Sequence, residues 1–171
     1  PTRRSSDLLL AKKIIAVFDE NNKSPEEKQR LLAMTQALVE REPQYVEGHL
    51  ALIGSIDHED AQAREAAIDK ALYLFPDESR VQAAYFYDVA YRRDRDELEG
   101  MLSQFSNSAE AYYYYAAGIW SPKNKEETLI NLEKAQEMDP KNKKIQETIK
   151  SVQTTNSIKI IGPSFSLGDE K

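Results

Sequence analysis

The sequence predicts an all-α fold built from about four helix-turn-helix repeats and a C-terminal capping helix. One observation is a recurring helix terminator, because Pro43, Pro76 and Pro140 each end a helix-and-turn unit and Ser106 occupies the remaining position. The spacings are 33, 30 and 34 residues, and a fixed period in this range is typical of helical repeat proteins. The other observation is a set of apolar stripes with helical period, each preceded by a helix start signal.

The first two helices are predicted over residues 9–19 and 25–41. Ser24, Pro25 and Glu27 form the clearest start signal of the chain. Serine is the N-cap, proline stands at the first helical position, and glutamate stands where a capping box needs it. Pro43 ends the second helix, because proline has no amide proton and clashes with the preceding turn.

Three further pairs and a closing helix follow the same pattern. The predicted pairs cover residues 46–56 with 59–74, 80–91 with 96–105, and 109–120 with 125–137. The expected N-caps of the second helices are Asp57, Asp94 and Asn124. Residues 141–153 carry one apolar stripe with a charged back, which suits a helix that covers the open face of the last repeat.

The chain divides into residues 1–8, 9–153 and 154–171. Residues 1–8 read as the end of a common sequencing adapter translated in frame, so we expect an artefact of an assembled bacterial gene from an environmental sample. Residues 9–153 form one repeat domain, since 171 residues are few for two independent domains. Residues 154–171 are expected to form a loosely held tail. The strand character of residues 157–161 leaves pairing with a sheet edge of a partner as the alternative.

Residues 109–142, AEAYYYYAAGIWSPKNKEETLINLEKAQEMDPKN, resemble a tetratricopeptide repeat (TPR). The matching contact and terminator positions are Tyr112, Tyr115, Ala116, Leu132, Ala135 and Pro140. Residues 79–106 and 46–76 follow the pattern more loosely, and residues 12–43 match it least. The resemblance implies a right-handed superhelical solenoid whose first helices line a concave groove, and it implies a role in protein–protein interaction.

Composition and charge exclude several classes of function. The net charge of −6 offers no basic face for nucleic acid or anionic lipid. No stretch reaches the roughly 18 apolar residues of a membrane-spanning helix. We therefore predict neither nucleic-acid binding nor membrane insertion. The chain has no cysteine, which excludes disulfides and thiol chemistry and leaves a cytoplasmic and a periplasmic location equally open.

Signatures of enzymes and of metal or cofactor sites are also missing from the sequence. It contains no glycine-rich phosphate loop, no GxSxG and no HExxH. Its two histidines, His49 and His58, occupy a predicted packing position and a helix start. No second cluster of ligands completes a metal site. We predict a protein without catalytic activity, cofactor or metal.

Aromatic residues supply the candidate binding site, because ten of the fifteen lie between Tyr85 and Trp120. In the register of the TPR resemblance, Tyr85, Phe86, Tyr112 and Tyr115 face the core, and the groove is lined by Tyr87, Tyr91, Tyr113, Tyr114 and Trp120 with Arg80 and Arg92 beside them. Tyrosine and tryptophan are enriched in binding hot spots, and arginine suits carboxylates. The alternative is that the rings serve packing between repeats and that the arginines pair with neighbouring acids.

The leading hypothesis is a protein-interaction module, a scaffold or adaptor, that holds a peptide or helix of a partner protein in this groove. A second hypothesis is that the chain is the C-terminal accessory lobe of a larger bacterial enzyme or sensor. A third is an architectural spacer without a ligand. The double substitution Tyr87→Ala and Tyr113→Ala separates them, since only a binding groove predicts lost partner capture with unchanged helical content.

Overall fold

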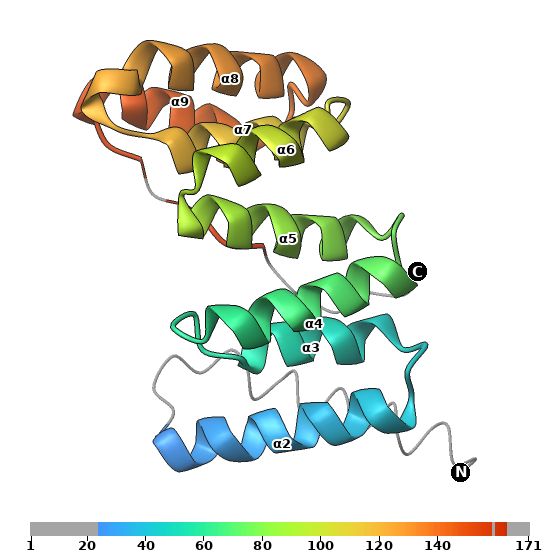
Figure 1. The fold of residues 1–171 in the computed structure, drawn as a ribbon. Coiled ribbons are helices and arrows are strands. Elements are labelled where there is room, and N and C mark those ends of the chain that lie inside the picture. Colours follow the sequence, from blue (N-terminus) through green and yellow to red (C-terminus); the bar gives the residue numbers. More distant parts are fainter. Residues whose placement is uncertain (1–23, 159, 164–171) are drawn as a thin grey trace. The chain divides into compact units, whose positions relative to one another are not determined.

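The computed structural model describes residues 24–158 and 160–163, and this part of the chain is all-α, as the sequence predicts (Figure 1). Within it there is no strand. The elements are α2 (Pro25–Arg41), α3 (Val46–Ser55), α4 (Ala61–Leu74), α5 (Ser79–Arg92), α6 (Arg95–Gln104), α7 (Ala109–Ile119), the 3₁₀ helix η2 (Pro122–Asn124), α8 (Lys125–Met138) and α9 (Lys143–Thr155). The helix predicted over residues 9–19, the suspected artefact and residues 164–171 lie outside the described residues.

Two of the predicted N-caps, Ser24 and Asp94, are present in the structure with their side-chain hydrogen bonds. At α2 the Glu27 amide donates to Ser24 Oγ at 3.2 Å, and the Ser24 amide donates to Glu27 Oε2 at 2.7 Å, which completes the capping box. At α6 the Glu97 amide donates to Asp94 Oδ1 at 3.0 Å. Each such cap contributes about 1 kcal/mol, because it satisfies an amide that has no partner inside its helix.

Of the other two predicted N-caps, Asp57 is wrong, whereas Asn124 is the N-cap residue of α8 as predicted. The N-cap of α4 is Asp60, whose Oδ1 accepts from the Ala63 amide at 3.2 Å, because Asp57 instead begins a turn that delays the helix. Asn124 makes no side-chain cap for α8. Its Nδ2 donates to the Ile119 carbonyl at 3.1 Å and so closes the end of α7, since η2 has already turned the chain.

One turn recurs four times between the second helix of a pair and the helix that follows. It starts at the C-cap residues Glu42, Phe75, Phe105 and Asp139, whose amides donate to the carbonyl four residues before them. The residue three positions after each C-cap donates its amide back to the C-cap carbonyl at 3.0–3.2 Å. The C-caps are 33, 30 and 34 residues apart, so the period of the prolines is also the period of the helix ends.

Three of these turns share a further hydrogen bond from the side chain six residues after the proline. In the three turns, His49 Nε2 donates to the Pro43 carbonyl at 3.0 Å, Gln82 Nε2 donates to the Pro76 carbonyl at 2.7 Å, and Gln146 Nε2 donates to the Pro140 carbonyl at 2.7 Å. The remaining turn has Ser106 in place of proline and Tyr112 in place of the donor, and Tyr112 packs in the core instead. The bond ties the first turn of each helix to the loop before it.

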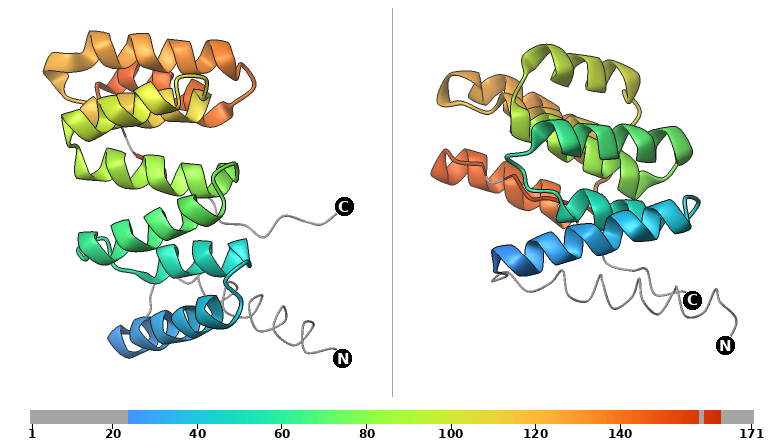
Figure 2. Two further views of the ribbon diagram at one scale, coloured as in Figure 1. Left: turned by 45° about the vertical axis from the view of Figure 1, so that its right-hand side comes forward. Right: turned by 60° about the horizontal axis from the view of Figure 1, so that its bottom comes forward.

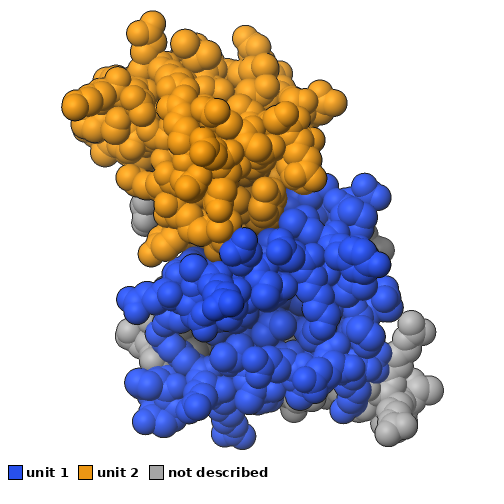
Figure 3. All heavy atoms as spheres, in the orientation of Figure 1, with its two compact units in different colours: residues 1–82, 164–171 blue, residues 83–163 orange. Residues whose placement is uncertain are grey.

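The chain forms two compact units, and the boundary between them falls inside α5 (Figure 3). The described part of unit 1 ends at Gln82 and contains α2, α3 and α4, with α3 in contact with both other helices. The buried Arg64 of α4 donates to the Ile53 and Ile56 carbonyls at 2.9 and 3.3 Å, so it closes the end of α3. This buried cationic cap is not foreseen from the sequence.

Unit 2 spans Ala83–Pro163 and is organised around α7, which contacts α6 on one side and α8 on another, while α8 contacts α9 (Figure 2). Its core joins apolar side chains from α5 to α9 in one cluster. The closing helix predicted over residues 141–153 is present as α9, with Ile145, Ile149 and Val152 buried in that cluster. The described residues of the predicted tail, up to Pro163, belong to this unit as well.

Candidate functional site

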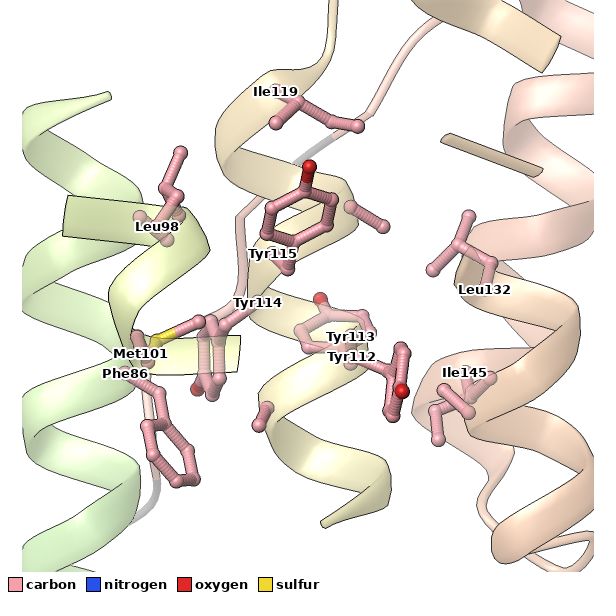
Figure 4. Close-up of a cluster of buried hydrophobic side chains, with 14 of the residues drawn as sticks. Phe86, Leu98, Met101, Tyr112, Tyr113, Tyr114, Tyr115, Ile119, Leu132 and Ile145 are labelled. Atoms are coloured by element: carbon pink, nitrogen blue, oxygen red, sulfur yellow. The ribbon is translucent and has the colours of Figure 1, made fainter. Parts of the chain in front are cut away.

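Helix α7 is the most heavily covered helix of unit 2. Every residue from Ala111 to Ile119 is buried, whereas an amphipathic surface helix leaves its polar face open. Its four tyrosines leave the helix in different directions (Figure 4). On the side of α8, Tyr115 donates to Glu127 Oε1 at 3.1 Å and the Lys134 ammonium lies 4.4 Å above the Tyr112 ring. The face that was expected to be an open groove must therefore be covered by something else.

The cover includes residues 157–163, called the C-terminal segment below, of which residue 159 is not described. Asn156 ends α9 in the left-handed conformation, with φ of 52°, a conformation that asparagine tolerates at helix ends. The Ser157 carbonyl then accepts from Ser151 Oγ of α9 at 3.1 Å. The Ile161 carbonyl accepts from the Tyr114 hydroxyl of α7 at 3.0 Å.

The segment next reaches α5. A Cβ built on Gly162 would lie 3.4 Å from Cζ of Tyr87, so the glycine backbone rests on that ring. The segment thus passes α9, α7 and α5 in this order, and it can be followed in Figure 1. Ile158 and Ile160 are partly buried against the core cluster, while the Ile161 side chain stays 42% exposed. It is an extended stretch of chain laid across three helices, not a strand.

Beneath the segment lies a row of four tyrosine rings from α5 and α7. The ring centroids of Tyr113 and Tyr114 are 5.0 Å apart, those of Tyr114 and Tyr87 are 6.1 Å apart, and those of Tyr87 and Tyr91 are 6.3 Å apart. The first two pairs meet edge to face at 77° and 70°, the arrangement that ring quadrupoles favour. The row runs from the fully buried Tyr113 and Tyr114 to Tyr91, which is 51% exposed.

Lys144 of α9 fixes the inner end of this row. Its ammonium donates to the Tyr114 hydroxyl at 3.0 Å and lies 4.3 and 4.4 Å from the ring centroids of Tyr113 and Tyr114. Glu110 Oε1 lies 3.9 Å from the same ammonium. Burial lowers the pKa of Lys144 and raises the pKa of Glu110, and in each case the partner's charge opposes the shift.

The Tyr114 hydroxyl is held in one orientation by these contacts. An ammonium can only donate, so the Tyr114 oxygen accepts from Lys144, and its own proton points to the Ile161 carbonyl. Burial raises the pKa of Tyr114, with the nearby Glu110 charge acting in the same direction, so the hydroxyl keeps its proton. The result is an aimed O–H donor at the bottom of an aromatic surface, suited to the carbonyl of an extended polypeptide.

The structure brings together four of the seven residues proposed from the sequence: Tyr87, Tyr91, Tyr113 and Tyr114. It buries Tyr113 and Tyr114 rather than leaving them open, with 1% and 0% exposure, because Lys144 and the C-terminal segment cover that face. Tyr85, expected in the core, is half-buried and lies against the rings of Phe86 and Phe105.

The other three are not part of the tyrosine row. Trp120 is the half-buried C-cap of α7. Arg80 belongs to unit 1, where it pairs with Glu78 at 2.8 Å and Glu47 at 3.2 Å. Arg92 pairs with Asp88 at 3.3 Å and Glu97 at 3.1 Å. Both arginines are thus engaged by carboxylates of their own chain, the arrangement that the local-pairing alternative describes.

Sequence reasoning missed Lys144, Glu110 and the covering role of the C-terminal segment. The alternation of Ile158 and Ile160 was the available signal, since it predicts one buried face. Nothing in the sequence around Lys144 distinguishes it from the other lysines of the same helix, because its setting depends on a helix 30 residues earlier.

No other chemistry competes for this site within the part of the chain that the structure describes. His49 is buried, bonded to the Pro43 carbonyl and 5.4 Å from the Phe75 ring, which is the packing role expected of it. No group of three or more His, Cys, Asp or Glu side chains converges among the described residues. None of the described helices is long and apolar enough to span a bilayer.

Unit 1 has a cleft of about 850 Å³ between α2, α3 and α4, with Leu31, Leu52 and Ile56 among its lining residues.

Comparison of this chain with known proteins found no matching family model, no matching curated protein and no matching solved structure.

Proposed function

We propose that this chain is a protein-interaction module of the TPR-like type, in which the helix pairs stack as a right-handed solenoid and a partner protein supplies a polypeptide segment to the tyrosine row of unit 2. The observation that carries the proposal is the C-terminal segment itself. It rests on this row as extended chain, with one of its carbonyls accepting from the Tyr114 hydroxyl. A surface that accepts an extended backbone in cis has the chemistry to accept one in trans.

The repeated turns support the repeat architecture. Four C-caps at spacings of 33, 30 and 34 residues start the same turn, and three of the turns carry the same side-chain bond to a proline carbonyl. Repeats of this kind bury their apolar faces on one another and leave extended surfaces for binding.

The composition of the row supports a protein ligand. Tyr87 is half-buried and Tyr91 is half-exposed, so each offers a rigid ring backed by a neighbouring ring. Tyrosines in such settings are frequent hot spots, worth about 2 kcal/mol or more on truncation to alanine. Because Arg92 is already paired with Asp88 and Glu97, recognition rests on apolar burial and main-chain hydrogen bonds rather than on ion pairs.

Photo-crosslinking tests the proposal. A photo-reactive phenylalanine analogue replaces Tyr91 in the full chain, and the control carries the same analogue in place of Tyr73, which is 86% exposed on α4 of unit 1. We expect one protein to crosslink at position 91 and not at position 73, through a mapped stretch of its sequence. Tyr87→Ala should lower the yield severalfold, while circular dichroism stays unchanged.

Two results would count against the proposal. Equal crosslinking from both positions would indicate adhesion without a site. A yield that Tyr87→Ala leaves intact, in a folded chain, would mean that the partner does not use the tyrosine row.

A further inference from the structure

We infer that residues 157–163 are a built-in competitor for the tyrosine row, and that the partner is an extended peptide with the same chemistry: branched aliphatic side chains at alternate positions, followed by a small residue. This inference rests on the proposed function and adds the class of partner and the way its access is controlled.

The C-terminal segment is held by few contacts. No backbone-to-backbone hydrogen bond involves it among the described residues. Its attachment includes the Ser151 and Tyr114 hydroxyls bonded to two of its carbonyls, the hydrogen bond between the Thr155 and Ser157 hydroxyls, the approach of Gly162 to the Tyr87 ring, and the partial burial of Ile158 and Ile160. A strand in a sheet or a packed helix is held by a ladder of backbone bonds. The described residues of the segment have none, so a peptide with the same contacts can replace them.

The surface beneath the segment does not depend on it. Tyr114 is fixed by Lys144 from α9 and by the rings of Tyr113 and Tyr87, and none of these residues belongs to the segment. The aimed hydroxyl therefore remains after the segment leaves, ready for another carbonyl. Recognition through a preformed donor loses little conformational freedom on binding.

The positions of the segment define what a competing peptide must present. Ile158 and Ile160 lie against the core cluster, whereas the Ile161 side chain points away and is 42% exposed. The Ile161 carbonyl is the accepting group. At Gly162 a Cβ would meet the Tyr87 ring at 3.4 Å, an ordinary van der Waals contact, so a small residue fits there and the further methyl groups of a branched side chain would press on the ring. The pattern is thus apolar at positions 158 and 160, unrestricted at position 161 and small at position 162.

Covalent attachment gives the segment an advantage over any free peptide. An intramolecular ligand on a short linker acts at an effective concentration on the order of millimolar. A free peptide with the same contacts competes poorly against it, and weakening the segment should open the row. The segment therefore limits the access of a partner peptide to the tyrosine row, and it has the same chemical pattern as that peptide.

The test uses the full chain and a fluorescent synthetic peptide, SIKIIGP, which is the sequence of residues 157–163. The releasing variant carries Ile158→Ser with Ile160→Ser, and the matched control carries Ile161→Ser, because that side chain is exposed. We expect the releasing variant to bind the peptide about tenfold more tightly than the unaltered chain, and the control to bind as the unaltered chain does. Adding Tyr114→Phe to the releasing variant should reduce the gain.

A second route covers the case in which the double variant loses its fold. Gly162→Val adds a branched side chain that would press on the Tyr87 ring and keeps both core-facing isoleucines. It should weaken the hold of the segment and so also strengthen peptide binding. The inference is overturned if a folded releasing variant binds no better than the unaltered chain, or if the control gains as much. Dimers formed by exchange of the segment between copies, seen by size-exclusion chromatography of the unaltered chain, would overturn it too.

The peptide assay is independent of the natural partner. Partner crosslinking at position 91 without any gain in peptide binding would leave the proposed function standing and remove the inference alone. A gain in peptide binding without partner crosslinking would establish the competitor and remove the proposed partner site.

Discussion

Helices α3 and α7 follow the same recurring turn, yet they are buried to different extents. In α3 five of ten residues are buried. In α7 nine of eleven are buried, without a gap from Ala111 to Ile119. Both sequences are apolar for most of their length. The difference teaches that the burial of a helix after this turn depends on what later parts of the chain place on its second face.

The side chains of the two helices match this difference in cover. Position 51 in α3 is alanine, whereas the equivalent position of α7 is Tyr114, which meets the C-terminal segment. Near its end α7 has Gly118, where a Cβ would lie 2.7 Å from Leu98 Cδ2 and 3.2 Å from the Ala90 Cα. Helix α7 thus combines large rings on one side with a residue that permits close approach on another.

The largest effect on the free energy of unfolding is expected from a substitution in the covered face of α7. Tyr114→Ala should lower the free energy of unfolding by about 3–5 kcal/mol, because it removes a fully buried ring and leaves a cavity. Tyr73→Ala, at a ring that is 86% exposed, should change it by less than about 0.5 kcal/mol. Urea denaturation followed by circular dichroism measures both. Similar losses for the two variants would show that the cover of α7 contributes little stability.

A smaller effect compares glycines at the two helices. Gly118→Ala should cost about 1–3 kcal/mol, because the added methyl overlaps Leu98 and approaches the backbone of Ala90. Gly48→Ala in α3 should be neutral or slightly stabilising, since its Cβ would meet Leu38 and Tyr45 only at 3.4 Å and alanine favours the helix. Urea denaturation followed by circular dichroism measures the free energy of unfolding of both variants. A stabilised Gly118→Ala variant would show that α7 is not tightly enclosed at this point.

The smallest expected effect is a dependence on pH that belongs to α3. Burial lowers the pKa of His49, with the Lys70 charge acting in the same direction and the Pro43 carbonyl opposing. The unfolded chain therefore binds the proton more readily, and stability should fall as the pH drops below the ordinary imidazole pKa of about 6.5. The contribution of the neutral His49 side chain to stability should be fully present above that pH.

The substitution His49→Gln tests the predicted direction of this pH dependence, because Gln82 and Gln146 make the same bond to a proline carbonyl in two other turns. His49→Gln should keep the bond and flatten the change in unfolding free energy between pH 7.5 and 5.5. Denaturation midpoints of both proteins at the two pH values measure it. An unchanged slope in the variant would assign the effect to other groups.

Much of the fold could be predicted because its signals are local. The Ser24 capping box, the Asp94 cap and the ends at Glu42 and Asp139 lie within a few residues of the bonds they make. The cap of α4 was misassigned, because Asp57 and Asp60 compete within four residues. Asn124 was correctly placed as the N-cap of α8, but its side chain turns to the preceding helix instead of capping α8. Local competition of this kind is not resolved by residue type alone.

The candidate site was predictable in part. The concentration of rings indicated α5 and α7, and Tyr87, Tyr91, Tyr113 and Tyr114 do lie in one row. Which of them solvent reaches was not predictable, because Lys144 and Ile161 approach Tyr114 from 30 and 47 residues further along the chain.

By itself the sequence determined where most of the described helices of this protein begin and end, and the interval at which their turns repeat. Caps, prolines and apolar stripes act over one or two helical turns, so their effects can be read without knowing the fold. Only the tertiary structure decided that the face of α7 is closed. That outcome depends on a left-handed Asn156 turning the chain back and on an extended segment finding the Tyr114 hydroxyl, and contacts between distant residues exist only once the helices have packed.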